Sequence, residues 1–162
     1  MNRWRVSRGW IIVWFGCALS VPLGWTAEAP ESSASLYISP RTAQGWLAEG
    51  QRVVFLDVRE SDEFAAGHLP GAINISHDRV TSIMDRLDRT APLVLYCIHS
   101  AHRAPEAAKV LRQHGFANAV VLEGGIVAWH AGGAMILASH PSQPPTILPL
   151  TERCAQKAAP HS

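Results

Sequence analysis

Two hydrophobic patterns alternate along the middle of the chain. Nearly continuous apolar runs at residues 53–58, 72–75, 94–97 and 119–122 are typical of strands covered on both faces of a parallel sheet. Between these runs, apolar residues recur at the spacing of a helix face, and polar or glycine residues mark the helix ends. This alternation of strands and helices predicts an α/β domain with a mostly parallel sheet.

The predicted helices begin and end at residues that favour helix caps. Ser39 precedes a proline, a favoured pair at a helix start, and Gly115 is a typical helix stop. Asp78 can cap a helix whose apolar face ends at Leu87. In chain order, the predicted helices span residues 40–47, 61–66, 78–87, 105–114 and 126–130.

The N-terminal region has a different pattern. Residues 1–8 contain three arginines and no acid, and residues 10–25 form a nearly uninterrupted apolar run. This run is short for a membrane span and fits the apolar core of a signal peptide. Residues 1–29 therefore predict export to the periplasm or elsewhere outside the cytoplasm. The segment is either a cleaved signal peptide or an uncleaved anchor that attaches the protein to a membrane through residues 10–25.

The composition changes again on both sides of the predicted domain. Residues 30–35 are rich in Ala, Ser, Glu and Pro, which is typical of a linker. The domain follows at residues 36–133, and the proline-containing residues 134–162 predict an extended C-terminal tail. Cys154 in that tail is either a resolving thiol for Cys97 or, as is more common, a free exposed cysteine.

Length and charge exclude several classes of protein. With 162 residues, 48% of them hydrophobic and 17% charged, the chain has room for one domain with extensions at both ends. The net charge is +1 without a long basic run, so we expect no nucleic-acid partner. Three cysteines are too few for a disulfide scaffold.

The stretch around Cys97 carries the candidate chemistry. A β-prone run stops at this cysteine, and a short polar turn leads into the helix predicted from Pro105. Backbone N–H groups in such a loop, together with the helix dipole, stabilise an anion or a thiolate. Cys97 is therefore the candidate nucleophile, and Arg103 can fork onto two oxygens of an oxyanion. The other residues of the loop are candidate substrate-binding residues: Ile98, His99, Ser100, Ala101, His102 and Ala104.

Plainer interpretations of this loop remain open. A buried cysteine at the end of a strand is commonly just a small apolar side chain. Cys97, His99 and His102 also look like a partial set of metal ligands. A closed structural zinc site needs four ligands, and no second cysteine or histidine pair lies nearby in the sequence. We therefore expect no metal and no other cofactor.

Several motifs, taken in order, resemble those of the rhodanese domain. The resemblance covers roughly residues 36–133, the length of one small domain. It implies a five-stranded parallel sheet flanked by helices. The motifs that carry it are DVRE at 57–60, EF at 63–64, GHLPGAINI at 67–75, Tyr96-Cys97 with the loop ending in Arg103-Ala104, LEGGI at 122–126, and Ala128-Trp129.

The resemblance also implies an activity, which is sulfur transfer. In this family a cysteine thiolate attacks the outer sulfur of a small-molecule donor such as thiosulfate, becomes a persulfide, and passes the sulfur to a thiol or cyanide. Here that cysteine is Cys97, and the thiol acceptor is a small molecule or a protein. Asp57 and Arg59 match a family motif that we interpret as structural support, an acid and base pair that fixes strand ends.

The loop differs from the family pattern in one respect. The usual sulfurtransferase loop places the arginine five positions after the cysteine, often with a glycine between them, whereas Arg103 is six positions on and no glycine intervenes. Seven-residue loops resemble those of cell-cycle dual-specificity phosphatases and related arsenate reductases, whose wider cradle accepts a tetrahedral oxyanion. A phosphatase or arsenate-reductase-like enzyme, with Glu106 and Glu123 as candidate general acids, is therefore one alternative. A non-catalytic module that binds a partner or carries a redox thiol is the other.

Overall fold

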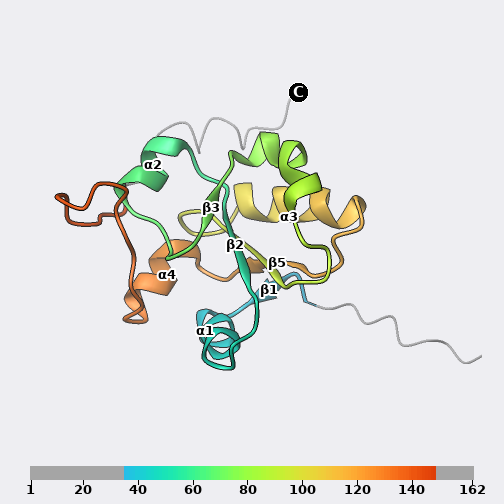
Figure 1. Ribbon diagram of the computed structural model, residues 1–162, viewed down its shortest axis with the longest axis horizontal. Coiled ribbons are helices and arrows are strands. Elements are labelled where there is room, and N and C mark those ends of the chain that lie inside the picture. The colour runs from blue at the N-terminus through green and yellow to red at the C-terminus, as the bar shows by residue number, and fades with distance from the viewer. Residues whose placement is uncertain (1–34, 149–162) are drawn as a thin grey trace, which may run out of the picture. The chain divides into compact units, whose positions relative to one another are not determined.

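The computed structural model of the protein describes residues 35–148 (Figure 1). The predicted export segment and linker, up to residue 34, and the end of the predicted tail with Cys154 lie outside the described residues. Within residues 35–148, no helix is both long enough and apolar enough to cross a membrane.

Five parallel strands pair in the order β1-β5-β4-β2-β3 in the described part of the chain. The central strand, β4, pairs with β2 on one side and β5 on the other, and all four of its residues are buried. The predicted α/β fold with a parallel five-stranded sheet is thus confirmed. The strands are β1 (Tyr37–Ile38), β2 (Val54–Asp57), β3 (Ile73–Asn74), β4 (Leu93–Tyr96) and β5 (Ala119–Leu122).

The helical segments of residues 35–148 follow the strands in sequence. Ser39 caps the first helix as predicted, because its Oγ accepts the N–H of Thr42 at 3.1 Å. The segments are α1 (Pro40–Ala48), α2 (Ser61–Ala66), the 3-10 helix η1 (His77–Arg86), α3 (Arg103–Gln113) and α4 (Gly125–Ala131).

The helix predicted at residues 78–87 is present, but it is a 3-10 helix and Asp78 is not its cap residue. η1 begins one residue earlier, with Ser76 at the cap position, and its turns close three residues apart instead of four. The N–H of Leu87 illustrates this spacing, since it donates to the carbonyl of Met84 at 3.2 Å. The β-branched residues Val80 and Ile83 weaken the preference for an α-helix here, although the segment still buries Val80 and Met84 as predicted from its apolar face.

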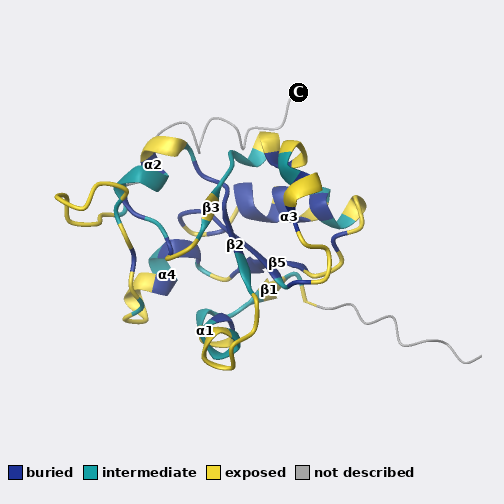
Figure 2. Ribbon diagram, viewed as in Figure 1, coloured by how far each residue is buried: buried dark blue, intermediate teal, exposed yellow. Residues whose placement is uncertain are grey.

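The sheet is covered on both faces, and its side chains alternate between two apolar clusters. Leu93 and Leu95 of β4 pack in one cluster with residues of η1 and α3. Val94 and Tyr96 pack in the other with residues of α1 and α4. Figure 1 shows these two sets of helices on opposite sides of the strands, and Figure 2 shows that the central strands are buried. The carboxyl ends of β2 and β4 are therefore held in register between two packed layers.

Residues 134–148, the first part of the predicted extended tail, contain no helix and lie against α2. Leu137 and His68 exchange two backbone hydrogen bonds of 2.8 Å, which form an isolated antiparallel bridge. Farther on, the N–H of Thr146 donates to the carbonyl of Ala66 at 2.9 Å. Ile136 is buried in the same cluster as α4. This segment therefore stays in contact with the domain up to at least residue 146.

Candidate active site

Cys97 lies immediately after β4, at the carboxyl end of the central strand. Its side chain is buried, and it forms no disulfide with another described residue. α3 begins at Arg103, two residues before the predicted start at Pro105. A proline is tolerated in the first turn because the N–H groups there have no partner within the helix. Arg103 is therefore the first residue of the helix, and the loop proper spans residues 97–102.

The loop buries some of the candidate substrate-binding residues and exposes others. Ile98, Ser100 and Ala104 are buried, whereas His99, Ala101 and His102 are exposed. The structure thus places residues 98–102 in the loop that follows Cys97, with both histidines exposed to solvent, and Ala104 in the first turn of α3.

Ser100 makes the sharp backbone turn in the middle of the loop. Its φ is +54°, the left-handed region that most residues avoid. Its Oγ accepts the N–H of Cys97 at 3.3 Å, and this hydrogen bond links the middle of the loop to its first residue. Ser100 therefore fixes the backbone from which the Cys97 side chain emerges.

The start of α4 holds the other side of the loop. The N–H of Ile126 donates to the carbonyl of Cys97 at 3.0 Å, and that of Val127 to the carbonyl of Ile98 at 3.2 Å. Gly125 lies so close that a Cβ at this position would overlap both carbonyl oxygens. A glycine is required here both for this approach and for a φ of +60°. The Gly-Gly pair was visible in the sequence as a turn, but its contact with the loop was not.

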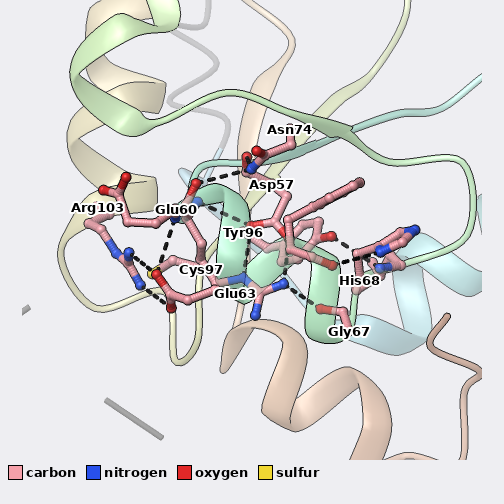
Figure 3. A network of polar contacts seen from close by, with 12 residues as sticks. Asp57, Glu60, Glu63, Gly67, His68, Asn74, Tyr96, Cys97 and Arg103 are labelled. Atoms are coloured by element: carbon pink, nitrogen blue, oxygen red, sulfur yellow. Dashed lines mark hydrogen bonds and ion pairs between the residues drawn. The ribbon is translucent and has the colours of Figure 1, made fainter. Parts of the chain in front are cut away.

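Arg103 forms a two-point ion pair with Glu63, which comes from α2 (Figure 3). Its Nη1 donates to Oε2 at 2.7 Å and its Nη2 to Oε1 at 3.0 Å. Oε2 also accepts the N–H of Glu60, which closes a capping box at the start of α2. Burial alone would raise the pKa of Glu63, but the hydrogen bonds and charge of Arg103, the N–H of Glu60 and the charge of Arg59 together outweigh it, and the pKa is lowered.

The sequence did not reveal this role of Glu63. Its position in the first turn of α2 suggested only a favourable interaction with the helix dipole. Nothing in the spacing joins it to Arg103, 40 residues later. No local pattern in the sequence therefore signals the pair.

Asp57 and Arg59 form a second buried pair at the end of β2. Nε of Arg59 donates to Oδ1 of Asp57 at 2.8 Å, and Nη2 donates to the carbonyl of Gly67 at 2.6 Å. Burial alone would lower the pKa of Arg59, but the hydrogen bond and charge of Asp57 raise it. Asn74 donates to the carbonyls of both residues of the pair. These contacts join the ends of β2, β3 and α2 behind the loop.

Metal ligands are not grouped in the described part of the chain. No cluster of three or more His, Cys, Asp or Glu side chains within residues 35–148 could hold a metal ion. Cys97, His99 and His102 do not form such a cluster, because the cysteine is buried and the two histidines are exposed.

Two relatives of known name that are similar to this chain are both described as sulfurtransferases. A thiosulfate sulfurtransferase, GlpE, of Shewanella oneidensis is 32% identical over 88 residues, which cover 54% of this chain and 86% of the relative. A probable adenylyltransferase/sulfurtransferase, MoeZ, of Mycobacterium tuberculosis is 34% identical over 104 residues, which cover 63% of this chain and 26% of MoeZ.

Solved structures share the fold. A rhodanese-related protein of Thermoplasma volcanium superposes with a TM-score of 0.56 at 27% identity, over 64% of this chain and 98% of its own. Residues 39–132, more than half of the chain, match the rhodanese-like domain family. The matched residues include β2 to β5 and Cys97, and the chain therefore belongs to the rhodanese-like domain family, among whose members it is similar to sulfurtransferases.

Proposed function

We propose that the protein is a sulfurtransferase in which Cys97 carries a sulfane sulfur from a donor such as thiosulfate to a thiol or cyanide. The observation that supports this most is the position of Cys97. It is a free thiol at the carboxyl end of the central strand, where ligands of parallel α/β sheets bind. The similarity to thiosulfate sulfurtransferases over the same residues adds support.

The reaction has two steps. The Cys97 thiolate forms a bond to the outer sulfur of thiosulfate, the sulfur–sulfur bond of the donor breaks, and its electron pair leaves with sulfite. The acceptor thiolate or cyanide then attacks the outer sulfur of the Cys97 persulfide, and the Cys97 thiolate is regenerated. The loop and the adjacent start of α3 favour negative charge on the sulfur in each step.

A cyanolysis assay tests this proposal. The wild type should release thiocyanate from thiosulfate and cyanide, and Cys97→Ser should release none, because a hydroxyl cannot form the persulfide. Arg103→Ala should also lower kcat/KM, because it leaves the buried carboxylate of Glu63 without this partner beside the loop. Full activity of Cys97→Ser would refute the proposal.

A second function, oxyanion chemistry on a phosphate or arsenate, is favoured by one observation. Arg103 stands six positions after Cys97, which widens the cradle by one residue. Deletion of Ala101, which is exposed, would restore the shorter spacing. A sulfurtransferase should keep or raise its thiosulfate turnover after this deletion. An oxyanion enzyme should instead lose the hydrolysis of an aryl phosphate, or the reduction of arsenate, that its parent shows.

A further inference from the structure

The only Lys or Arg of residues 97–104 is held by a carboxylate from another element. Arg103 and Glu63 meet through two hydrogen bonds, and their side chains are only 10% and 6% exposed. This fork-to-fork geometry is the one that arginine uses to bind the oxygens of planar and tetrahedral oxyanions. Glu63 therefore occupies the place on Arg103 that a sulfonate or phosphate would otherwise take.

Glu63 is fixed in this place by the helix that carries it. Its Oε2 accepts the N–H of Glu60 at 3.1 Å, and Glu60 is the cap residue of α2. In Figure 3 the Glu63 side chain reaches from α2 toward Arg103, on the side of the loop where Cys97 lies. The carboxylate is therefore part of the preorganised surroundings of the loop.

The ion pair changes the charge that a donor meets. Arg103 supplies one positive charge, which the Glu63 carboxylate balances, and the Cys97 thiolate adds a negative charge during reaction. Because both members of the pair are buried, solvent and salt screen them weakly. His99 and His102 are exposed to solvent, where any charge that they carry is strongly screened. An anionic donor thus approaches surroundings with an excess of negative charge.

We propose that Glu63 is a specificity-determining residue, which makes the loop favour sulfane donors with one negative charge over dianionic thiosulfate. Thiosulfonates, R–SO₂–S⁻, and organic persulfides are such donors. This inference rests on the proposed sulfur transfer and adds the class of donor. Glu63 does not touch the reacting atoms; it acts as a positioning residue, through Arg103.

Sulfur transfer from a thiosulfonate to Cys97 conserves atoms, electrons and charge. The Cys97 thiolate forms a bond to the outer sulfur, the bond between the two donor sulfurs breaks, and its electron pair leaves with the sulfinate R–SO₂⁻. Cys97 is oxidised to the persulfide while the donor is reduced to the sulfinate. No proton, metal or further oxidant takes part.

A matched pair of donors tests the inference on the full chain. Methanethiosulfonate and thiosulfate both deliver a sulfane sulfur but differ by one charge, and cyanide serves as acceptor for both. Glu63→Gln removes the negative charge, and glutamine at this position still closes a capping box. The ratio of kcat/KM for thiosulfate to that for methanethiosulfonate should rise at least ~10-fold, as expected when one charge is removed from a weakly screened site.

The change should come mainly from a lower KM for thiosulfate. A merely structural role of Glu63 would lower both activities together and leave the ratio unchanged, which would overturn the inference. Asp62→Asn is the matched control, because Asp62 is an exposed acid in the first turn of α2, the helix that carries Glu63. Its ratio should stay within about twofold of the wild type, since exposed charges are screened. An equal shift in this control would also overturn the inference.

A second measurement keeps Glu63 and requires no turnover. Alkylation of Cys97 is followed in the presence of sulfate or methanesulfonate at constant ionic strength, with Cys17 and Cys154 replaced by Ser. Methanesulfonate should protect at a lower concentration than sulfate; equal or better protection by sulfate would overturn the role of Glu63. If neither donor is turned over, the proposed sulfur transfer fails, and this protection experiment still decides the charge preference of the loop.

Discussion

At the scale of single residues, the loop depends on a serine in a backbone conformation that favours glycine. Ser100 has a φ of +54° and is 2% exposed. Holding a residue with a Cβ in this region costs about 1–2 kcal/mol. The hydrogen bond that its Oγ accepts from the N–H of Cys97 offsets part of this cost.

Two substitutions of Ser100 separate these effects. Ser100→Ala loses the acceptor for a buried N–H but keeps the unfavourable φ, so the free energy of unfolding should fall by about 1–3 kcal/mol. Ser100→Gly loses the same acceptor but relieves the backbone, so it should be more stable than Ser100→Ala by about 1 kcal/mol. Urea denaturation of both variants measures the difference. If Ser100→Gly is the less stable of the two, the loop is not strained at this position.

The ion pair of Glu63 predicts a dependence of stability on pH. Because the pKa of Glu63 is lowered in the folded protein, its contribution is present above its ordinary pKa of about 4.3 and is lost as the pH falls through the lowered value. The difference in unfolding free energy between wild type and Glu63→Gln should therefore be constant from about pH 5 to 7 and shrink below about pH 4. Urea denaturation across this range, at one ionic strength, measures it. A difference that does not change with pH would show that the carboxylate is not stabilised by Arg103.

At the scale of elements, the sequence predicted the strands and most helices but not the contacts between them. Continuous apolar runs identify buried strands because both faces of the sheet are covered. The 3-10 character of η1 was not predicted, because an apolar face repeats similarly in both kinds of helix, whereas the hydrogen-bond spacing leaves little trace in sequence. β1 was the exception among the strands and was not predicted, because the apolar run around it covers only residues 36–38.

The candidate site was predictable only in part, for the same reason. Cys97 and Arg103 lie in one short loop, so local pattern brings them together. Glu63 and Gly125 reach this loop from α2 and α4, and their contacts depend on how those helices pack on the sheet. Pairings across the fold are not encoded in local spacing, and one sequence alone does not reveal them.

The contact between α4 and the loop gives a prediction at this scale. Gly125→Ala places a methyl group against the carbonyl oxygens of Cys97 and Ile98 and forces alanine to a φ of +60°. The free energy of unfolding should fall by at least ~2 kcal/mol, within the range for backbone strain and overpacking. Gly45→Ala is the control, because no atom lies within 4 Å of its added Cβ. In the interior of α1 this change should be neutral or stabilise by up to about 1 kcal/mol. Equal stability of the two variants would contradict a close contact between Gly125 of α4 and the loop.

At the scale of the whole molecule, we propose that the domain acts outside the cytoplasm. The arginine-rich start and the apolar run of residues 10–25 support this proposal. A reporter that works only outside the cytoplasm, fused after Ser162, should be active with the full chain and inactive when residues 1–29 are removed. Activity of a strictly cytoplasmic reporter on the full chain would contradict export.

The central claim is that Cys97 carries sulfur, and intact-protein mass spectrometry tests it most directly. The full chain, with Cys17 and Cys154 replaced by Ser, is exposed to thiosulfate and in parallel to methanethiosulfonate. The account predicts a gain of one sulfur atom, located on Cys97, that disappears when cyanide is added and never forms in Cys97→Ser. A protein whose Cys97 still reacts with an alkylating reagent but gains no sulfur from either donor would contradict it.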